Sequence, residues 1–130
     1  MLDFRLQIID INMENSFQKL KVWQKAHNTV LKIYKMSESF PSIERYRLTD
    51  QICRSISSVP ANIVEGNSRK YKKEFIQFLF IAKSSLEETK YHLLLASDLN
   101  YIKNEEYQKI LQDCQEIGKM LTKLIQYLQR

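Results

Sequence analysis

Apolar residues recur every three or four positions along most of this chain, which is the period of an amphipathic α-helix. In the run over residues 45–65 the apolar side chains fall within about 80° of one helical face. These side chains are Leu48, Ile52, Ile56, Val59 and Ile63. Three further runs with the same period cover residues 18–36, residues 72–99 and the chain from Asn104 onward. The pattern therefore predicts four helices, each with an apolar face.

Residues that start or stop helices separate these runs. Ser16 and Ser42 are the expected N-caps of the first two helices, and Asn104, followed by two glutamates, is expected to start the fourth. Gly66 is expected to end the second helix in a left-handed conformation, which glycine adopts without strain. The three connections are short, so successive helices must be antiparallel. We therefore predict an all-α, up-down-up-down four-helix bundle over residues 16–130.

The first residues follow a different pattern. Residues 2–8 alternate between apolar and polar side chains, which is the period of a β-strand. The rest of the chain has no strand pattern with which this segment could pair. Residues 1–15 are therefore predicted to be an appendage to the bundle, either disordered or an extension from an upstream start.

The composition is typical of one helical domain. The chain has 130 residues, enough for one core, and its 2 glycines and 2 prolines provide few turns for a sheet. No apolar run approaches the length of about 18 residues that indicates a membrane helix, and no leader with a cleavage site is evident. We expect a cytoplasmic protein without membrane contact. Cys53 and Cys114 lack the close spacing of a zinc or redox motif and are expected to be a surface and a core thiol.

The net charge of +5 is concentrated in the first part of the chain. Up to residue 73 there are 13 Lys and Arg against 7 Asp and Glu, whereas from residue 74 onward there are 7 against 8. Such asymmetry favours a polyanionic partner. Residues 69–73 join four cations to Tyr71, a combination that can hold phosphates and stack on an unpaired base. The alternative is an ordinary solvated loop.

The candidate nucleic-acid-binding residues include this cluster and two further groups of cations, on the first helix and around the start of the second. If the cluster does not bind, these two groups are the expected site. The full set is Arg69, Lys70, Tyr71, Lys72, Lys73, Arg54, Arg47, Arg45, Lys21 and Lys25.

A polar stripe lies beside the apolar face of the second helix. Its members are Gln51, Arg54, Ser58, Asn62 and Glu65. A solvated helix face usually carries mostly Lys and Glu, so this composition indicates a partner surface or a buried hydrogen-bond network, with an ordinary exposed flank as the alternative. Ile76 and Phe80 lie off the core stripe of the third helix, where a monomer would leave them exposed. We therefore predict that copies of the chain associate into a closed ring.

Reactive side chains are too scattered to predict an enzyme. His27 and His92 lie far apart in the sequence, and neither follows an Arg at the spacing of a helical ribonuclease. Glu88 and His92 have the wrong spacing for the Glu-x-x-His motif of a di-iron bundle. Gly-rich phosphate loops and Ser-His-Asp signatures are absent from the sequence. We predict no catalytic residue, metal or cofactor.

The segment Asn62-Ile63-Val64-Glu65-Gly66 resembles the Asn-Ile-Ala-Glu-Gly signature of proteins encoded in 23S ribosomal RNA intervening sequences. The similarity in spacing and order extends from about Phe17 to Leu128. Cys53 stands where many relatives carry the first Arg of an Arg-Arg pair, and Ser84 where many carry Gly. This family includes the accessory variability protein of diversity-generating retroelements. The resemblance implies a four-helix bundle, a basic homopentamer, and nucleic-acid binding alongside a reverse transcriptase.

The expected function is that of a non-enzymatic accessory protein that binds RNA or DNA and is encoded in a 23S rRNA intervening sequence or similar element. Its expected partners are further copies of itself, nucleic acid, and a reverse transcriptase or ribonucleoprotein. The alternative is a helical adaptor that docks a protein and has no direct nucleic-acid role. A ribonuclease is disfavoured.

Overall fold

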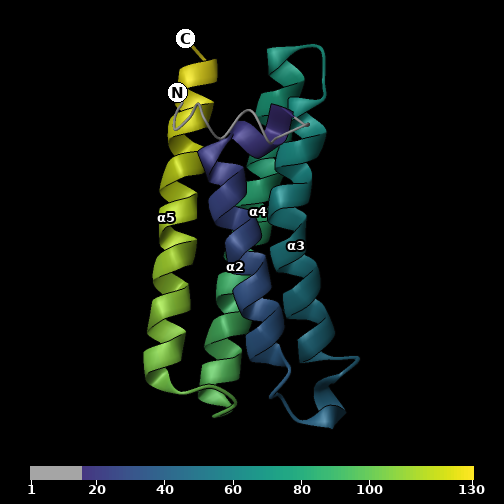
Figure 1. Ribbon diagram of the computed structural model, residues 1–130, viewed down its shortest axis with the longest axis vertical. Helices are drawn as coiled ribbons and strands as arrows, with labels where there is room; N and C mark the ends of the chain where they lie inside the picture. Colours follow the sequence, from purple (N-terminus) through teal and green to yellow (C-terminus); the bar gives the residue numbers. More distant parts are fainter. Residues whose placement is uncertain (1–15) are drawn as a thin grey trace.

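The structure is a computed structural model that describes residues 16–130, and the predicted appendage, residues 1–15, lies outside the described residues. Four helices form an antiparallel bundle (Figure 1), with short 3₁₀ turns before the first and second of them. In chain order the elements are η1 (Ser16–Lys19), α2 (Lys21–Ser37), η2 (Ser42–Glu44), α3 (Leu48–Asn67), α4 (Lys72–Asp98) and α5 (Asn104–Leu128). Helices adjacent in sequence pack together, and α5 closes against α2. The predicted all-α, four-helix fold is confirmed.

The core is made of the apolar faces that the sequence pattern predicts. All five residues of the α3 stripe are buried, and four of them are completely inaccessible to solvent. Facing them are Leu79, Ala82, Leu86, Leu93 and Ala96 of α4 and Ile110, Cys114, Ile117, Leu121 and Ile125 of α5. Each buried Ile or Leu contributes about 1.5–3 kcal/mol. These stripes therefore determine which side of each helix faces the bundle axis.

The starts of α2 and α3 differ from the prediction. Ser16 begins the turn η1, and α2 starts after that turn without a side-chain cap. Ser42 likewise begins η2, and α3 starts only at Leu48 because Arg47 adopts a non-helical conformation with φ −121° and ψ −109°. The backbone N–H of Leu48 donates a hydrogen bond of 3.3 Å to the carboxylate of Glu44. A carboxylate at a helix N-terminus also complements the helix dipole, so Glu44 takes the role predicted for Ser42.

Gly66 lies inside α3, so the predicted left-handed helix end is wrong. Neither Gly66 nor Gly118 has a positive φ. Gly66 is required for a different reason. A Cβ atom at this position would lie 2.8 Å from both Cδ1 of Phe75 and Cβ of Phe78, and 3.2 Å from the Phe75 carbonyl oxygen. Glycine inside a helix costs about 1 kcal/mol relative to alanine, and here that cost allows α3 to approach the first turns of α4.

Small polar side chains also join α3 to α4, two to three helical turns from this close approach. The hydroxyl oxygens of Ser58 and Ser85 lie 2.9 Å apart, and Asn62 Nδ2 donates to the Ser58 carbonyl oxygen at 2.7 Å and to its hydroxyl at 2.9 Å. The buried Thr89 hydroxyl donates to Ser55 Oγ at 2.8 Å. Each such bond contributes about 0.5–1.5 kcal/mol. The polar stripe was interpreted as a partner surface, a buried hydrogen-bond network or an exposed flank. For Ser58 and Asn62 the structure agrees with the hydrogen-bond network.

Candidate nucleic-acid interface

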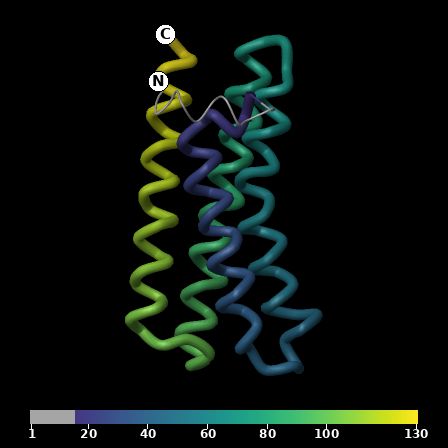
Figure 2. Tube along the Cα trace, viewed as in Figure 1, coloured from purple at the N-terminus to yellow at the C-terminus, as the bar shows by residue number. Residues whose placement is uncertain are grey.

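The turn between α3 and α4 carries the predicted cationic cluster and lies at the same end of the bundle as the C-terminus (Figure 2). The Arg69 guanidinium pairs with Glu65 at 2.8 Å and with Glu74 at 3.7 Å. Lys72 and Lys73 are exposed, and neither has a carboxylate partner among residues 16–130. Arg69 is therefore largely neutralised, whereas the two lysines leave positive charge available to an anion.

Tyr71 forms an exposed aromatic surface in the middle of this turn. It is the N-cap residue of α4, in an extended conformation with φ −108° and ψ 137°, and its side chain is 59% exposed. The ammonium group of Lys70 lies 5.6 Å from the centre of the ring. Glu74 in the first turn of α4 offsets part of the unfavourable interaction between the lysines and the helix dipole. The turn thus presents an aromatic ring between cations.

Two other predicted cations, Arg45 and Arg47, lie at the opposite end of α3. With 20 residues, α3 separates the two ends by about 30 Å. Arg47 Nε lies 3.5 Å from the Glu44 carboxylate, and Arg54 Nε lies 2.9 Å from the Asp50 carboxylate. The structure therefore does not bring the predicted cations together in one patch.

The predicted lysine Lys25 serves to join α2 to α5. Its Nζ lies 2.9 Å from Asp113 and 3.2 Å from Glu116, and Lys32 Nζ lies 2.9 Å from the other oxygen of Asp113. Partial burial alone would raise the pKa of Asp113, but the bonds from Lys25 and Lys32 hold that pKa below its usual value. The bond to Asp113 in turn raises the pKa of Lys25. Lys21, one turn earlier on α2, is exposed.

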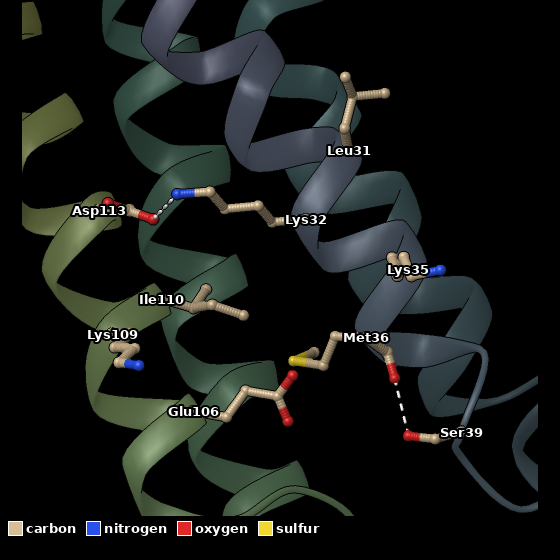
Figure 3. A pocket seen from close by; sticks show the side chains of 9 residues that line it. All are labelled: Leu31, Lys32, Lys35, Met36, Ser39, Glu106, Lys109, Ile110 and Asp113. Carbon is tan, nitrogen blue, oxygen red and sulfur yellow. Dashed lines mark hydrogen bonds and ion pairs between the residues drawn. The ribbon is translucent and has the colours of Figure 1, made fainter.

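A groove of about 670 Å³ opens between α2 and α5 beside this ion pair (Figure 3). The buried side chains of Met36 and Ile110 point into it. Its charged lining residues are Lys32, Lys35, Lys109, Glu106 and Asp113. Three cations thus face two carboxylates, and the groove has little net charge to attract a polyanion.

A second groove, of about 770 Å³, lies between α4 and α5 and was missed by the sequence analysis. Its charged lining residues are Lys83, Lys90, Lys119, Lys123 and Glu87. The second half of the chain has no excess of positive charge, so the charge count gave no signal for this groove. Spacings of seven residues on α4 and four on α5 place the lysines of each helix on one face. The two faces meet because of the way each helix is oriented about its own axis in the bundle, which the sequence pattern of the lysines does not show.

The outer face of α4 is partly apolar. Ile76 was expected to be exposed, but it is half-buried because it packs against the core. Phe80 is 48% exposed, as predicted for a residue off the core stripe. Tyr91 and Leu94, 59% and 43% exposed, lie within about 60° of Phe80 around the helix axis. This face remains available to another protein chain.

Glu44 is a buried carboxylate that the sequence did not reveal. The Tyr101 hydroxyl donates a hydrogen bond of 2.7 Å to Glu44 Oε2. This bond, assisted by the Leu48 N–H and the charge of Arg47, holds the pKa of Glu44 below its usual value despite burial, and the same bond raises the pKa of Tyr101. The pair ties the α2–α3 connection to the α4–α5 connection. Because 57 residues separate the partners, no local pattern could indicate the contact.

The two cysteines are not placed like reactive thiols. Cys114 is buried in the core, as predicted, and burial raises the pKa of its thiol to about 12. Cys53 was expected at the surface but is half-buried, packs against the core, and lies 3.5 Å from the Ser37 hydroxyl.

The histidines lie apart from one another in the structure. His92 Nε2 lies 3.2 Å from the Glu88 carboxylate, and the His27 ring stacks on Trp23 with ring centres 4.9 Å apart. Among residues 16–130, no group of three or more His, Cys, Asp or Glu side chains could hold a metal ion. None of the helices in the described part of the chain is long and apolar enough to cross a membrane.

Comparisons with known proteins agree with the resemblance found in the sequence. The family described as 23S rRNA-intervening sequence protein matches residues 18–123, from η1 into α5. A crystal structure of a protein with unknown function from the S23 ribosomal protein family of Bacteroides thetaiotaomicron is 31% identical, with a TM-score of 0.75 over 81% of this chain and 95% of that one. No curated protein is significantly similar in sequence. Since the family match covers most of the chain and the solved relative has the same fold, this chain belongs to the 23S rRNA-intervening sequence protein family.

Proposed function

We propose that this protein is a non-enzymatic, cytoplasmic accessory factor that binds RNA or DNA. The observation that carries the proposal is the turn between α3 and α4, where the exposed Tyr71 is flanked in the chain by the exposed Lys70, Lys72 and Lys73. The net charge of +5 favours an anionic ligand. The family description, which refers to intervening sequences of 23S rRNA, is in keeping with this ligand.

In this proposal the protein holds its ligand and makes or breaks no covalent bond. The lysines act as point charges on phosphates, and Tyr71 stacks on an unpaired base. Arg69, which pairs with Glu65 and Glu74, orders the turn and contributes little to phosphate binding.

Fluorescence anisotropy with labelled U and dT strands of about 20 nucleotides, between about 50 and 300 mM salt, tests this function. Replacing Lys70, Lys72 and Lys73 by Gln should lower the slope of log affinity against log salt by about 2 units, since each phosphate contact of a single strand accounts for about 0.7. Tyr71→Ala should weaken binding and leave the slope unchanged.

The control replaces the two lysines Lys103 and Lys109 by Gln. Both are exposed and lie toward the opposite end of the bundle, so this change of net charge should leave the slope nearly intact. An unmodified protein that fails to bind either strand at about 50 mM salt would contradict the proposed function.

We also propose that the protein assembles with itself into a closed ring, for which the family resemblance suggests five subunits. The apolar outer face of α4 supports an assembly, because Phe80, Tyr91 and Leu94 would be sheltered there. Light scattering should give a multiple of the 15.5 kDa chain, and Phe80→Gln should lower that mass. A monomer at micromolar concentration would refute the ring.

A protein adaptor is the second candidate, and the same outer face of α4 favours it. In this case the exposed apolar residues would dock a different protein, for example a reverse transcriptase, and the positive charge would serve solubility. A monomer that binds no nucleic acid would leave this candidate as the better explanation.

A further inference from the structure

The groove between α4 and α5 has an excess of positive charge that the proposed site at the α3–α4 turn does not use. Four lysines, Lys83, Lys90, Lys119 and Lys123, face the single carboxylate of Glu87. Lys90 Nζ lies 2.7 Å from Glu87, so this pair is neutral. Three positive charges remain in the groove. The groove between α2 and α5 is of similar size, but there three cations face two carboxylates.

The remaining lysines are available to a ligand to different degrees. Lys83 donates a hydrogen bond of 3.0 Å to the Thr122 hydroxyl on the other helix of the groove, which fixes the position of its ammonium group. Lys119 and Lys123 are exposed and have neither an ion pair nor a hydrogen bond within the described part of the chain. An anion in the groove would therefore meet one pre-positioned and two unpaired ammonium groups.

Gly118, on the α5 side of the groove, is not required by packing. A Cβ atom there would lie 3.5 Å from Cδ2 of Leu86, an ordinary contact, and the backbone φ is not positive. Gly66 differs, since its Cβ would collide with α4. Packing therefore gives no reason for this glycine, which costs its helix about 1 kcal/mol relative to alanine. The missing side chain leaves room for a ligand between the lysines.

We propose that the α4–α5 groove binds the phosphate backbone of a single nucleic-acid strand. Lys119 and Lys123 are about 6 Å apart along α5, and the lined part of α5, residues 115–126, is about 16 Å long. Both lysines therefore lie on one stretch of the groove wall, where successive phosphates of a strand can meet them. The inference rests on the proposed nucleic-acid function and adds a second contact surface to the α3–α4 turn.

The test is the affinity of the full chain for labelled U and dT strands of about 20 nucleotides, and for a duplex of the same length, measured as a function of salt. Lys119→Gln with Lys123→Gln should reduce the single-strand slope by about 1.4 units and weaken binding at least tenfold at low salt. The matched control is Lys103→Gln with Lys109→Gln, which makes the same change of charge on and just before α5. Lys109 is about 15 Å from Lys119, beyond the screening length of about 10 Å at 0.1 M salt, so the control should keep the slope.

A neutral variant tests the groove without removing charge. Gly118→Gln fills the opening with a good helix former, so it should weaken strand binding about tenfold while the thermal midpoint stays unchanged or rises. If Gly118→Gln and the Lys119/Lys123 double variant both bind as the unmodified protein does, the groove proposal is refuted and the proposed function stands on the turn alone. Labelled poly-glutamate serves as a probe for an acidic protein segment. If the groove variants lose affinity for poly-glutamate but keep their affinity for the strands, the groove proposal is also refuted, in favour of an acidic protein segment as the ligand. No binding of any strand by the unmodified protein would refute both proposals.

Discussion

Replacing each of the two glycines by alanine should shift stability in opposite directions. Both lie inside helices, so each substitution gains helix propensity, about 1 kcal/mol at Gly118 in the middle of α5 and less at Gly66 in the last turn of α3. At Gly66 the new Cβ would meet the Phe78 Cβ at 2.8 Å and the Phe75 carbonyl oxygen at 3.2 Å. These atoms belong to or adjoin the α4 backbone and cannot move aside independently, and such overpacking costs typically about 1–3 kcal/mol. At Gly118 the Cβ makes only an ordinary contact of 3.5 Å.

Helix propensity favours alanine at both positions, so a lower free energy of unfolding for Gly66→Ala than for Gly118→Ala reports mainly the cost of moving α3 away from α4. We expect Gly118→Ala to raise the free energy of unfolding by up to about 1 kcal/mol. The free energy of unfolding of Gly66→Ala should be about 1–3 kcal/mol lower than that of Gly118→Ala. Urea unfolding followed by helical circular dichroism measures both, with the slope against urea as a check that the denatured states remain comparable. Equal stabilisation by the two substitutions would show that α3 and α4 are not in close contact at Gly66.

Three further predictions concern the buried and paired side chains. Tyr101→Phe removes the hydrogen bond to Glu44 and should lower the free energy of unfolding at pH 7. The pKa of Glu44 is depressed in the folded protein, so unfolding curves should show this loss disappear as the pH falls below about 4 and the carboxylate is protonated. Asp113→Asn should cost about 1 kcal/mol at neutral pH, a modest value because its lysine partners are partly solvated. The pKa of Asp113 is lowered and that of Lys25 is raised, so the difference from the unmodified protein should persist between about pH 5 and 9 and shrink in acid or strong alkali; a constant difference at pH 3 would contradict the ion pair. The Cys114 thiol, with a pKa of about 12, should resist iodoacetamide at pH 8 until the protein unfolds, and rapid labelling of the native protein would refute its burial.

The fold could be predicted because its determinants repeat at the period of the helix. The stripe from Leu48 to Ile63 marks one face of α3 without reference to any other helix, and the burial of every member follows from it. The start at Asn104 was equally local, since two glutamates follow it in the first helical turn. By contrast, Gly66 was assigned to a helix end because a glycine before polar residues is typical of one. Its real role depends on the distance to α4, which no local pattern contains.

The candidate site was predictable only in part, because charge in a sequence does not show which charges are paired. Residues 69–73 do form a cationic turn, but Arg69 is neutralised by carboxylates on both flanking helices. Lys25 is used to join α2 to α5 through Asp113, a partner 88 residues away. The lysines of the α4–α5 groove come from two helices with no charge excess in sequence. Their proximity follows from the rotation of both helices, which the apolar core determines.

The close approach of α3 and α4 at Gly66 should make this hairpin the first part of the bundle to form during folding. Only residues 68–71 separate the two helices, so little loop entropy is lost when they meet, and they share the most extensive interface in the bundle. The contact of α2 with α5 must instead join segments about 80 residues apart in the chain, and it depends on residues that are synthesised after the hairpin. A chain emerging from the ribosome would therefore carry a folded α3–α4 hairpin, and the part of its apolar face that packs on α5 would stay uncovered until α5 is synthesised.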